Sequence, residues 1–236
     1  MKKWPHLRFE NFEVILPHLP EYLQILIKNK KNTISIYDLF ISKLIVKNNY
    51  LSKWCNELNI NEEDLNKKVI NNMPFAVTKD TKLHWFQYRL LHRILPSNTL
   101  LSKMHISDTA TCTFCNREDE SLLHLVFSCH IIDTFWKQLS AWLNTNCQIH
   151  INLDKETIIL GRKLEKKYNS SINLTLLLAK QFIFSQKLQK RKPELPNFII
   201  KLRYYYKMEK YINTKNNKSD LFKDRWATMT TFFELI

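Results

Sequence analysis

The sequence predicts an all-α fold in which one short loop containing cysteine and histidine is inserted between helices. Three observations lead to this fold class. The chain of 236 residues contains a single glycine, Gly161, which argues against a turn-rich β-sandwich. Long stretches of Leu, Ile, Lys, Glu and Gln recur at helical spacing. Three of the five cysteines lie in one short segment near the middle of the chain, CTFCNREDESLLHLVFSC at 112–129.

The same composition limits the classes of function. A single glycine excludes a P-loop, a dinucleotide-binding glycine motif and a nucleophile elbow, because each needs glycines where the backbone approaches a ligand or turns sharply. Hydrophobic residues make up 44% of the chain, so we expect a buried core. No apolar segment resembles a signal peptide or a membrane span. We therefore expect an intracellular protein of the nucleus or cytoplasm, with no membrane partner.

The chain divides into three segments along its length. Residues 1–74 are expected to form an N-terminal helical segment that ends at Pro74 and the loop after it. Residues 75–145 contain the cysteine loop with its flanking helices, and residues 146–236 form a basic C-terminal helical region. Within the first segment, the run NEED at 61–64 predicts a helix start with acids in the first turn.

The segment KLHWFQYRLLHRIL at 82–95 is the clearest amphipathic helix. At 100° per residue, one face is apolar and consists of Leu83, Phe86, Leu90 and Ile94. The opposite face is aromatic and basic and consists of Trp85, Tyr88, Arg89 and His92, with Arg93 at its edge. Such a face can stack on bases and contact phosphates. It is equally compatible with a helix that is buried on both sides and pairs Arg89 with a carboxylate.

Further helices are predicted on either side of the cysteine loop. Pro96 ends the helix at 82–95, and Ser97 can cap the next one. An amphipathic helix is expected at 131–143. Two long helices at 171–192 and 195–213 are expected to join at Pro193 and Pro196, and an exposed loop is expected at 212–220.

The net charge of +14 makes nucleic acid the first partner to consider. Residues 180–225 contain thirteen Lys or Arg and four Asp or Glu, which is +9 of that charge. The candidate nucleic-acid contacts in this region are Lys190, Arg191, Lys192, Arg203 and Lys207. Abundant Lys, Asn and Ile are also what an A/T-rich gene produces, so solvated surface lysine remains the alternative.

The central segment has the spacing C-x2-C, eight residues, then H-x4-C, formed by Cys112, Cys115, His124 and Cys129. Three thiolates and one imidazole complete a tetrahedral zinc site and leave no open position, so the pattern favours one structural Zn2+ over a catalytic one. The alternatives are buried apolar cysteines with a satisfied core histidine, and His130 as a substitute ligand for Cys129. Cys55 and Cys147 lie far away in sequence and are expected to be free thiols in a reducing compartment.

Residues 82–143 resemble the region that follows the polymerase domain of LINE-type (non-LTR) retrotransposon reverse transcriptases, which ends in a zinc-binding CCHC motif. The resemblance is carried by FQYRLLHR, the CxxC pair, the H-x4-C pair and the Phe-Trp helix after them, in the same order and spacing. It extends from about residue 75 to the end of the chain through LLLAKQFIF, the basic run and FKDRW.

The resemblance implies that Cys112, Cys115, His124 and Cys129 hold zinc, that RNA and DNA are partners, and that the region supports target-primed reverse transcription. That family's polymerase has a paired-aspartate motif, whereas this chain has no Asp-Asp pair. We therefore expect no polymerase or endonuclease activity of its own and no small-molecule substrate. The expected context is a C-terminal piece, a degenerate copy or a short derived gene, with a reverse transcriptase polypeptide or ribonucleoprotein as a further partner.

Two other functions compete with this one. The chain can be a zinc-stabilised protein–protein interaction module whose positive charge is incidental, or a retrotransposon remnant without function. A metallohydrolase is disfavoured, because the four ligands leave no position for a catalytic water.

Overall fold

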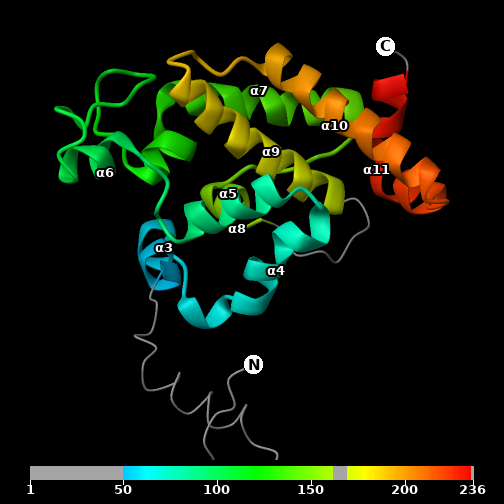
Figure 1. Ribbon diagram of the computed structural model, residues 1–236, viewed down its shortest axis with the longest axis horizontal. Coiled ribbons are helices and arrows are strands. Elements are labelled where there is room, and N and C mark those ends of the chain that lie inside the picture. The colour runs from blue at the N-terminus through cyan, green and yellow to red at the C-terminus, as the bar shows by residue number, and fades with distance from the viewer. Residues whose placement is uncertain (1–49, 162–168, 235–236) are drawn as a thin grey trace, which may run out of the picture. The chain divides into compact units, whose positions relative to one another are not determined.

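The computed structural model describes residues 50–161 and 169–234, which form a helical body (Figure 1). The elements in chain order are α3 (Tyr50–Leu58), the 3-10 turn η1 (Glu62–Asp64), α4 (Lys67–Val77), α5 (Thr81–Leu91), α6 (Asn98–Lys103), the π-helical turn η2 (His124–Ser128), α7 (His130–Cys147), α8 (Lys155–Leu160), α9 (Asn169–Leu188), α10 (Leu195–Lys215) and α11 (Ser219–Glu234). Within these ranges the only β-structure is one isolated bridge between Thr111 and Asp119. The predicted all-α class is confirmed.

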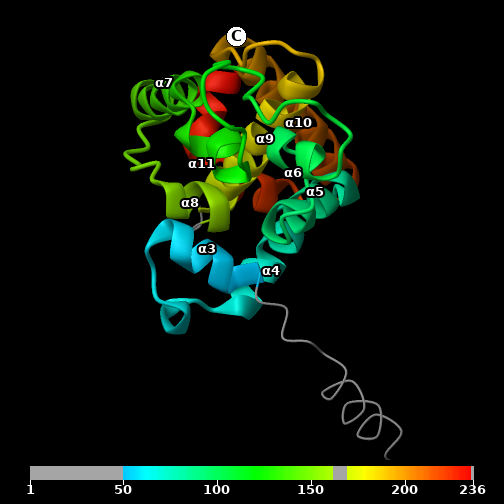
Figure 2. The same cartoon turned by 90° about the vertical axis from the view of Figure 1, so that its left-hand side faces the viewer.

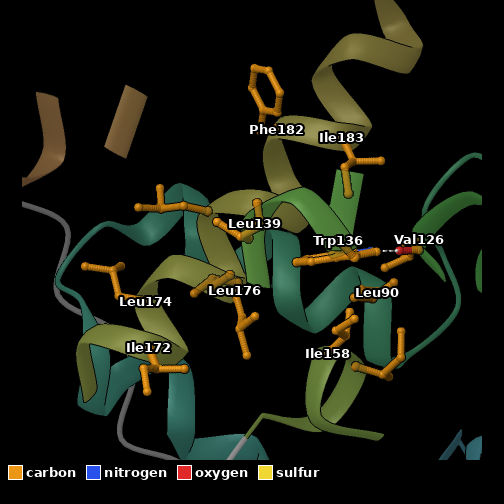
Figure 3. Close-up of a cluster of buried hydrophobic side chains, with 14 of the residues drawn as sticks. Leu90, Val126, Trp136, Leu139, Ile158, Ile172, Leu174, Leu176, Phe182 and Ile183 are labelled. Carbon is orange, nitrogen blue, oxygen red and sulfur yellow. Dashed lines mark hydrogen bonds between the residues drawn. The ribbon is translucent and has the colours of Figure 1, made fainter. Parts of the chain in front are cut away.

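Helix α9 lies at the centre of this body. It contacts α4, α5, α10, α11 and η2, and every residue from 171 to 180 is buried. A helix that is covered on all sides has no polar face, which explains why residues 171–180 are apolar or small and uncharged up to Lys180. Figure 3 shows the core around it, where side chains of α9 such as Leu176 and Ile183 meet Trp136 and Leu139 of α7.

Lys180 of α9 is a basic residue in this core, and it is fully buried. Its Nζ donates hydrogen bonds to Gln87 Oε1 at 2.8 Å and to the carbonyl oxygen of Ile159 at 3.2 Å. The Gln87 amide donates to the same Ile159 oxygen at 3.0 Å. Burial lowers the pKa of Lys180 to about 7. The lysine therefore joins α5, α8 and α9 inside the body and contributes nothing to a surface charge.

We expect stability to rise with pH between about 7 and 10.5 because of Lys180. In this window the unfolded chain binds one more proton than the folded chain, so the free energy of unfolding increases by about 1.4 kcal/mol per pH unit. Denaturant unfolding at several pH values should show a slope in Lys180→Met that is lower than the wild-type slope by about this amount. The matched control is Lys137→Met, at an exposed lysine of α7. A Lys180→Met variant with the wild-type slope would show that Lys180 is charged in the fold.

Helix α5 ends earlier than the sequence predicted, and this corrects one core residue. Arg93 adopts a left-handed conformation with φ of 59°, and the amide of Ile94 bonds to the carbonyl of Arg89 at 2.9 Å, which is a Schellman ending. The indole N–H of Trp54 caps the end by donating to the Leu91 carbonyl at 2.8 Å. Because the helical phase is lost at Arg93, Ile94 is 53% exposed and Leu95 is buried instead.

Three smaller expectations are also corrected. The run at 61–64 forms only η1, and α4 begins after Asn66, whose side chain accepts a bond from the Val69 amide at 3.1 Å. Pro74 lies inside α4 rather than after it, and it is buried. The loop expected at 212–220 shrinks to 216–218, because Asn217 takes a left-handed conformation that ends α10 sharply before α11.

None of the helices in the described ranges is long and apolar enough to cross a membrane. The expectation of helices within residues 1–49 lies outside the described residues. The predicted segment boundaries at 74/75 and 145/146 stay a prediction. One buried cluster contains side chains from all three predicted segments, from Leu51 to Phe233.

Candidate metal centre

The first two ligands of the predicted zinc site lie on a tight hairpin in the metal loop, which we define as residues 110–129. The amide of Cys112 donates to the Glu118 carbonyl at 2.8 Å, and the amide of Glu120 donates to the Ala110 carbonyl at 2.7 Å. Between these pairs the chain reverses at Asn116, which has a φ of 53°. Asn tolerates this left-handed conformation better than most residues do. The turn holds the thiols of Cys112 and Cys115 on one side of the hairpin.

The other two ligands lie on a π-helical turn that the sequence did not reveal. In an α-helix, residues five apart differ by about 500° of rotation, so His124 and Cys129 would point about 140° apart. The turn η2 instead closes an i to i+5 hydrogen bond, from the Cys129 amide to the His124 carbonyl at 3.0 Å. Ser121 starts the turn by accepting a bond from the His124 amide at 3.0 Å. The H-x4-C spacing therefore brings both side chains to one point.

A buried tryptophan supports the π-helical turn from α7. The indole N–H of Trp136 donates to the Val126 carbonyl at 2.8 Å, as Figure 3 shows. Trp136 is 2% exposed and stacks edge-on against Phe135 in the core. This bond pairs the indole with a backbone carbonyl of the π-helical turn inside the protein, where an unpaired polar group is costly. The position of Cys129 is thus tied to the core of the body.

The four ligand atoms converge. The sulfur atoms of Cys112 and Cys129 lie 4.0 Å apart, and Cys115 Sγ lies 3.4 Å from His124 Nε2. All four ligand atoms lie within 4.8 Å of one another. A tetrahedral zinc ion with Zn–S bonds of about 2.3 Å requires sulfurs roughly 3.8 Å apart. The residues therefore fit a closed Cys3His zinc site, and the four predicted ligands together form a candidate metal centre.

The electrostatics of the cluster also suit a cation. Burial raises the pKa of Cys112 to about 12 and raises that of Cys129 as well. Burial acts in the same direction on Cys115, but hydrogen bonds from the backbone N–H groups of Glu118 and Arg117, together with those to His124 and Cys112, outweigh it and lower the pKa of this thiol to about 6. Cys115 therefore ionises readily without a metal. A divalent cation bound between the ligands would favour the thiolate forms of Cys112 and Cys129 as well.

The imidazole of His124 is oriented by a carboxylate. Its Nδ1 lies 3.3 Å from Glu118 Oε2, while Nε2 faces the cysteines. A carboxylate that accepts from the second ring nitrogen fixes the tautomer and strengthens the imidazole as a ligand. The sequence analysis did not identify Glu118 as a site residue. The available signal was an acidic residue between the CxxC pair and His124.

The alternatives to this ligand set do not fit the geometry. Buried apolar cysteines need not converge with a histidine, yet these four residues do. His130 is exposed at the first position of α7, beside a buried Cys129. Cys55 and Cys147 are buried free thiols outside the cluster, as predicted.

A buried ion pair fastens the metal loop to the helical body. Glu120 is 0% exposed, and its carboxylate accepts bonds from the amides of Asn98 and Thr113, both at 2.9 Å. Lys187 of α9 lies 2.8 Å from the same carboxylate and also donates to the Pro96 carbonyl. Because Thr113 follows Cys112 directly, this pair holds the first ligand in place.

The aromatic and basic face predicted on α5 is exposed. Trp85 is 63% exposed and Tyr88 is 47% exposed, Arg89 is also exposed, and His92 is partly buried. The hypothesis of a helix buried on both sides is therefore wrong. Arg93 does not belong to this face, because its guanidinium pairs with Glu57 at 2.8 Å and covers the Trp54 ring at 3.9 Å.

The predicted basic region of residues 180–225 is less exposed than its charge implied. Lys180 and Lys187 are buried, Arg225 pairs with Glu209 at 3.3 Å, and Arg203 is partly buried. Lys190, Arg191 and Lys192 are exposed after α9, and Lys207 is exposed on α10. Helix α10 contains four tyrosines, and two of them have structural contacts. Tyr206 is buried, and the hydroxyl of Tyr205 donates to Asp80 Oδ2 at 2.9 Å.

The remaining tyrosines of α10 form a distinct surface, which we call the α10 stripe. It consists of Tyr204, Lys207, Tyr211 and Lys215, which follow one another at helical spacing and are all exposed. Both rings are 64% exposed, and Lys215 Nζ lies 5.7 Å from the Tyr211 ring. Glu209, the one carboxylate within α10, points elsewhere and bonds to Arg225 and Trp226.

Residues 43–136 match a family model described as zinc-binding in reverse transcriptase. The match includes all four members of the cysteine and histidine cluster. It begins earlier than the resemblance noted in the sequence, at 43 instead of about 75, and it leaves α8 to α11 outside. A search among curated proteins gave no match.

Proposed function

We propose that this chain, whose residues 43–136 are a zinc-binding domain of the kind found in reverse transcriptases, binds RNA or DNA and holds it for a polymerase. The observation that carries the proposal is the α10 stripe. It alternates tyrosine rings and ammonium groups along the helix without a carboxylate between them. Rings that stack on bases and cations that contact phosphates are how proteins bind single strands with little sequence preference.

Two further features support nucleic acid as the partner. Lys190, Arg191 and Lys192 precede α10 and add three exposed cations at its N-terminal side. The aromatic and basic face of α5 provides a second exposed surface of the same chemistry. In this proposal zinc has a structural role: it orders the metal loop and provides no reacting group. The chain supports target-primed reverse transcription by binding, and it contributes neither polymerase nor endonuclease chemistry.

The proposal predicts a salt-dependent affinity that depends on the basic turn at 190–192. For a single-stranded RNA, the logarithm of the binding constant should fall linearly with the logarithm of salt concentration, by about 0.7 per phosphate contact. Replacing Lys190, Arg191 and Lys192 with Ala should lower this slope by up to about 2. Fluorescence anisotropy titrations over a range of KCl concentrations measure it.

A control variant removes exposed lysines elsewhere. Lys137→Ala with Lys223→Ala lowers the net charge on α7 and α11, where the side chains are 76% and 74% exposed. Its slope should equal that of the wild type. An equal loss of slope in both variants would assign the effect to net charge and would contradict a defined phosphate-binding surface.

A protein–protein interaction module is the second candidate function, and one observation favours it. Three aliphatic side chains in the segment that precedes the metal loop are more than half exposed: Ile94, Met104 and Ile106. Such a surface fits an apolar partner. Affinity for nucleic acid that is absent, or that is flat with salt, would favour this function over the proposed one.

A further inference from the structure

A hollow between α4 and α5 has the size and lining of a ligand site. Its volume is 580 Å3, within the range of about 300–1,000 Å3 that small-molecule sites occupy. Residues of α4, such as Asn72 and Phe75, form one wall, and residues of α5, such as Trp85 and Tyr88, form the other. The two helices contact each other directly, so the walls are held by the fold. We call this hollow the aromatic cavity.

Aromatic rings dominate both walls. On the α5 side, ring centroids are 5.7 Å apart for Trp85 and Tyr88, 4.2 Å for Tyr88 and His92, and 4.2 Å for His92 and Tyr50. These contacts make a continuous row of four rings: Trp85, Tyr88 and His92 line the cavity, and Tyr50 of α3 continues the row beyond it. Across the cavity, Phe75 packs on His84 with centroids 4.3 Å apart.

The large rings at the cavity are unusually exposed. Phe75 is 59% exposed and Trp85 is 63% exposed. Burying such a ring against another flat group stabilises a complex by the hydrophobic effect and by stacking. Single exposed apolar residues are ordinary on protein surfaces, but several aromatic rings around one hollow indicate a binding surface.

The polar groups at the cavity fit a ligand that carries hydrogen-bonding edges and negative charge. Asn71 and Asn72 provide amides on the α4 wall, and Tyr50 donates to Asn71 Oδ1 at 2.7 Å. Among the residues that the structure describes, no Asp or Glu lines the cavity. Exposed cations flank it at helical spacing: Lys82 and Arg89 lie one turn on either side of Trp85.

We propose that the aromatic cavity binds an unstacked base of single-stranded nucleic acid, with Trp85 and Phe75 stacking on it and Lys82 and Arg89 contacting the flanking phosphates. This inference rests on the proposed function and names the chemistry of one contact within it. Splayed bases that stack on aromatic side chains and use their edges for hydrogen bonds are the usual targets in single-stranded RNA.

The lining distinguishes a base from an apolar protein segment. A groove for an amphipathic helix is lined by aliphatic side chains that accept anchors at i, i+3 and i+4. Here Leu91 and Pro74 are the aliphatic members of a lining that otherwise consists of rings, amides and a hydroxyl. Flat rings with an amide beside them match the face and the edge of a base.

The test compares two strands and two classes of variant in the full chain. The probes are a short single-stranded RNA and the same strand with abasic sites at its centre. Trp85→Ala and Phe75→Ala should each weaken binding of the base-bearing strand by roughly 5- to 100-fold, which corresponds to one lost base stack. Both should leave binding of the abasic strand and the salt slope nearly unchanged. Trp85→Phe, which keeps a ring, should restore most of the affinity.

Ile106→Ala is the matched control, because Ile106 is 66% exposed but lies away from the cavity. Thermal melting of every variant checks the fold, which these exposed positions should leave intact. Unchanged affinity of Trp85→Ala, with salt-dependent binding still present, would overturn the cavity assignment alone and would leave the hollow to an apolar protein partner. An equal loss of affinity of Trp85→Ala for the base-bearing and the abasic strand would also overturn the cavity assignment. A wild-type protein that binds neither strand would overturn the proposed function together with it.

Discussion

Cys112→Ser is expected to abolish zinc binding and to unfold the metal loop together with the segments that flank it, residues 105–143. Cys112 is fully buried, and its sulfur lies 4.0 Å from that of Cys129. Structural zinc contributes roughly 10–16 kcal/mol of folding free energy in small domains. This range equals or exceeds the total stability of most domains, about 5–15 kcal/mol. Hydrogen exchange should show lost protection in the loop and at the start of α7.

The matched control for this prediction is Cys147→Ser. Cys147 is also a buried thiol, 3% exposed, but it lies at the end of α7 outside the cluster. Its replacement makes the same chemical change without touching a ligand, so zinc content should stay at one ion per chain. A Cys112→Ser protein that keeps wild-type protection in residues 110–129 would show that zinc does not hold this loop.

Lys187→Met is expected to cost about 3–5 kcal/mol of stability, because it leaves the carboxylate of Glu120 buried without a cation. Glu120 is 0% exposed and Lys187 is 5% exposed, so solvent cannot replace the lost partner. The Pro96 carbonyl loses its donor as well. Because the pair joins α9 to the metal loop, the loop should lose order before the remaining helices do. Chemical denaturation of the zinc-loaded protein measures the loss.

A double-mutant cycle separates the ion pair from the loss of side-chain packing. Glu120→Gln keeps the shape of residue 120 and removes its charge, so Lys187→Met should cost clearly less in that background. Lys207→Met makes the same substitution at an exposed lysine of α10 and should be nearly neutral. Equal costs of Lys187→Met in both backgrounds would rule out a charge interaction between the two residues.

The zinc ligands were predictable because they are close in sequence. The types and the order of Cys112, Cys115, His124 and Cys129 match a Cys3His ligand pattern, which predicted a common site. How His124 and Cys129 are brought together was not visible in that pattern. The helices were predictable for a similar reason, since apolar residues at helical spacing depend on local geometry. The π-helical turn was not, because its i to i+5 bond depends on the support that Trp136 gives to Val126.

Charge was the least predictable property. Lys180 and Lys187 counted toward a basic surface, yet both are buried by partners 67 to 93 residues away in the chain. Arg93 likewise belongs to a pair with Glu57. Such long-range partners leave no periodic signal in the sequence. The α10 stripe and the turn at 190–192 are part of the exposed remainder of the basic region. They could be recognised only after the buried lysines and arginines had been identified.

Zinc K-edge X-ray absorption on the purified full chain tests the central claim most directly, that Cys112, Cys115, His124 and Cys129 hold one structural zinc ion. The expected spectrum contains three sulfur neighbours at about 2.3 Å, one nitrogen neighbour at about 2.0 Å and no water oxygen. The matching metal analysis should give one zinc per chain. A first shell of oxygen and nitrogen atoms, or protein purified without chelators that contains no zinc, would contradict the account.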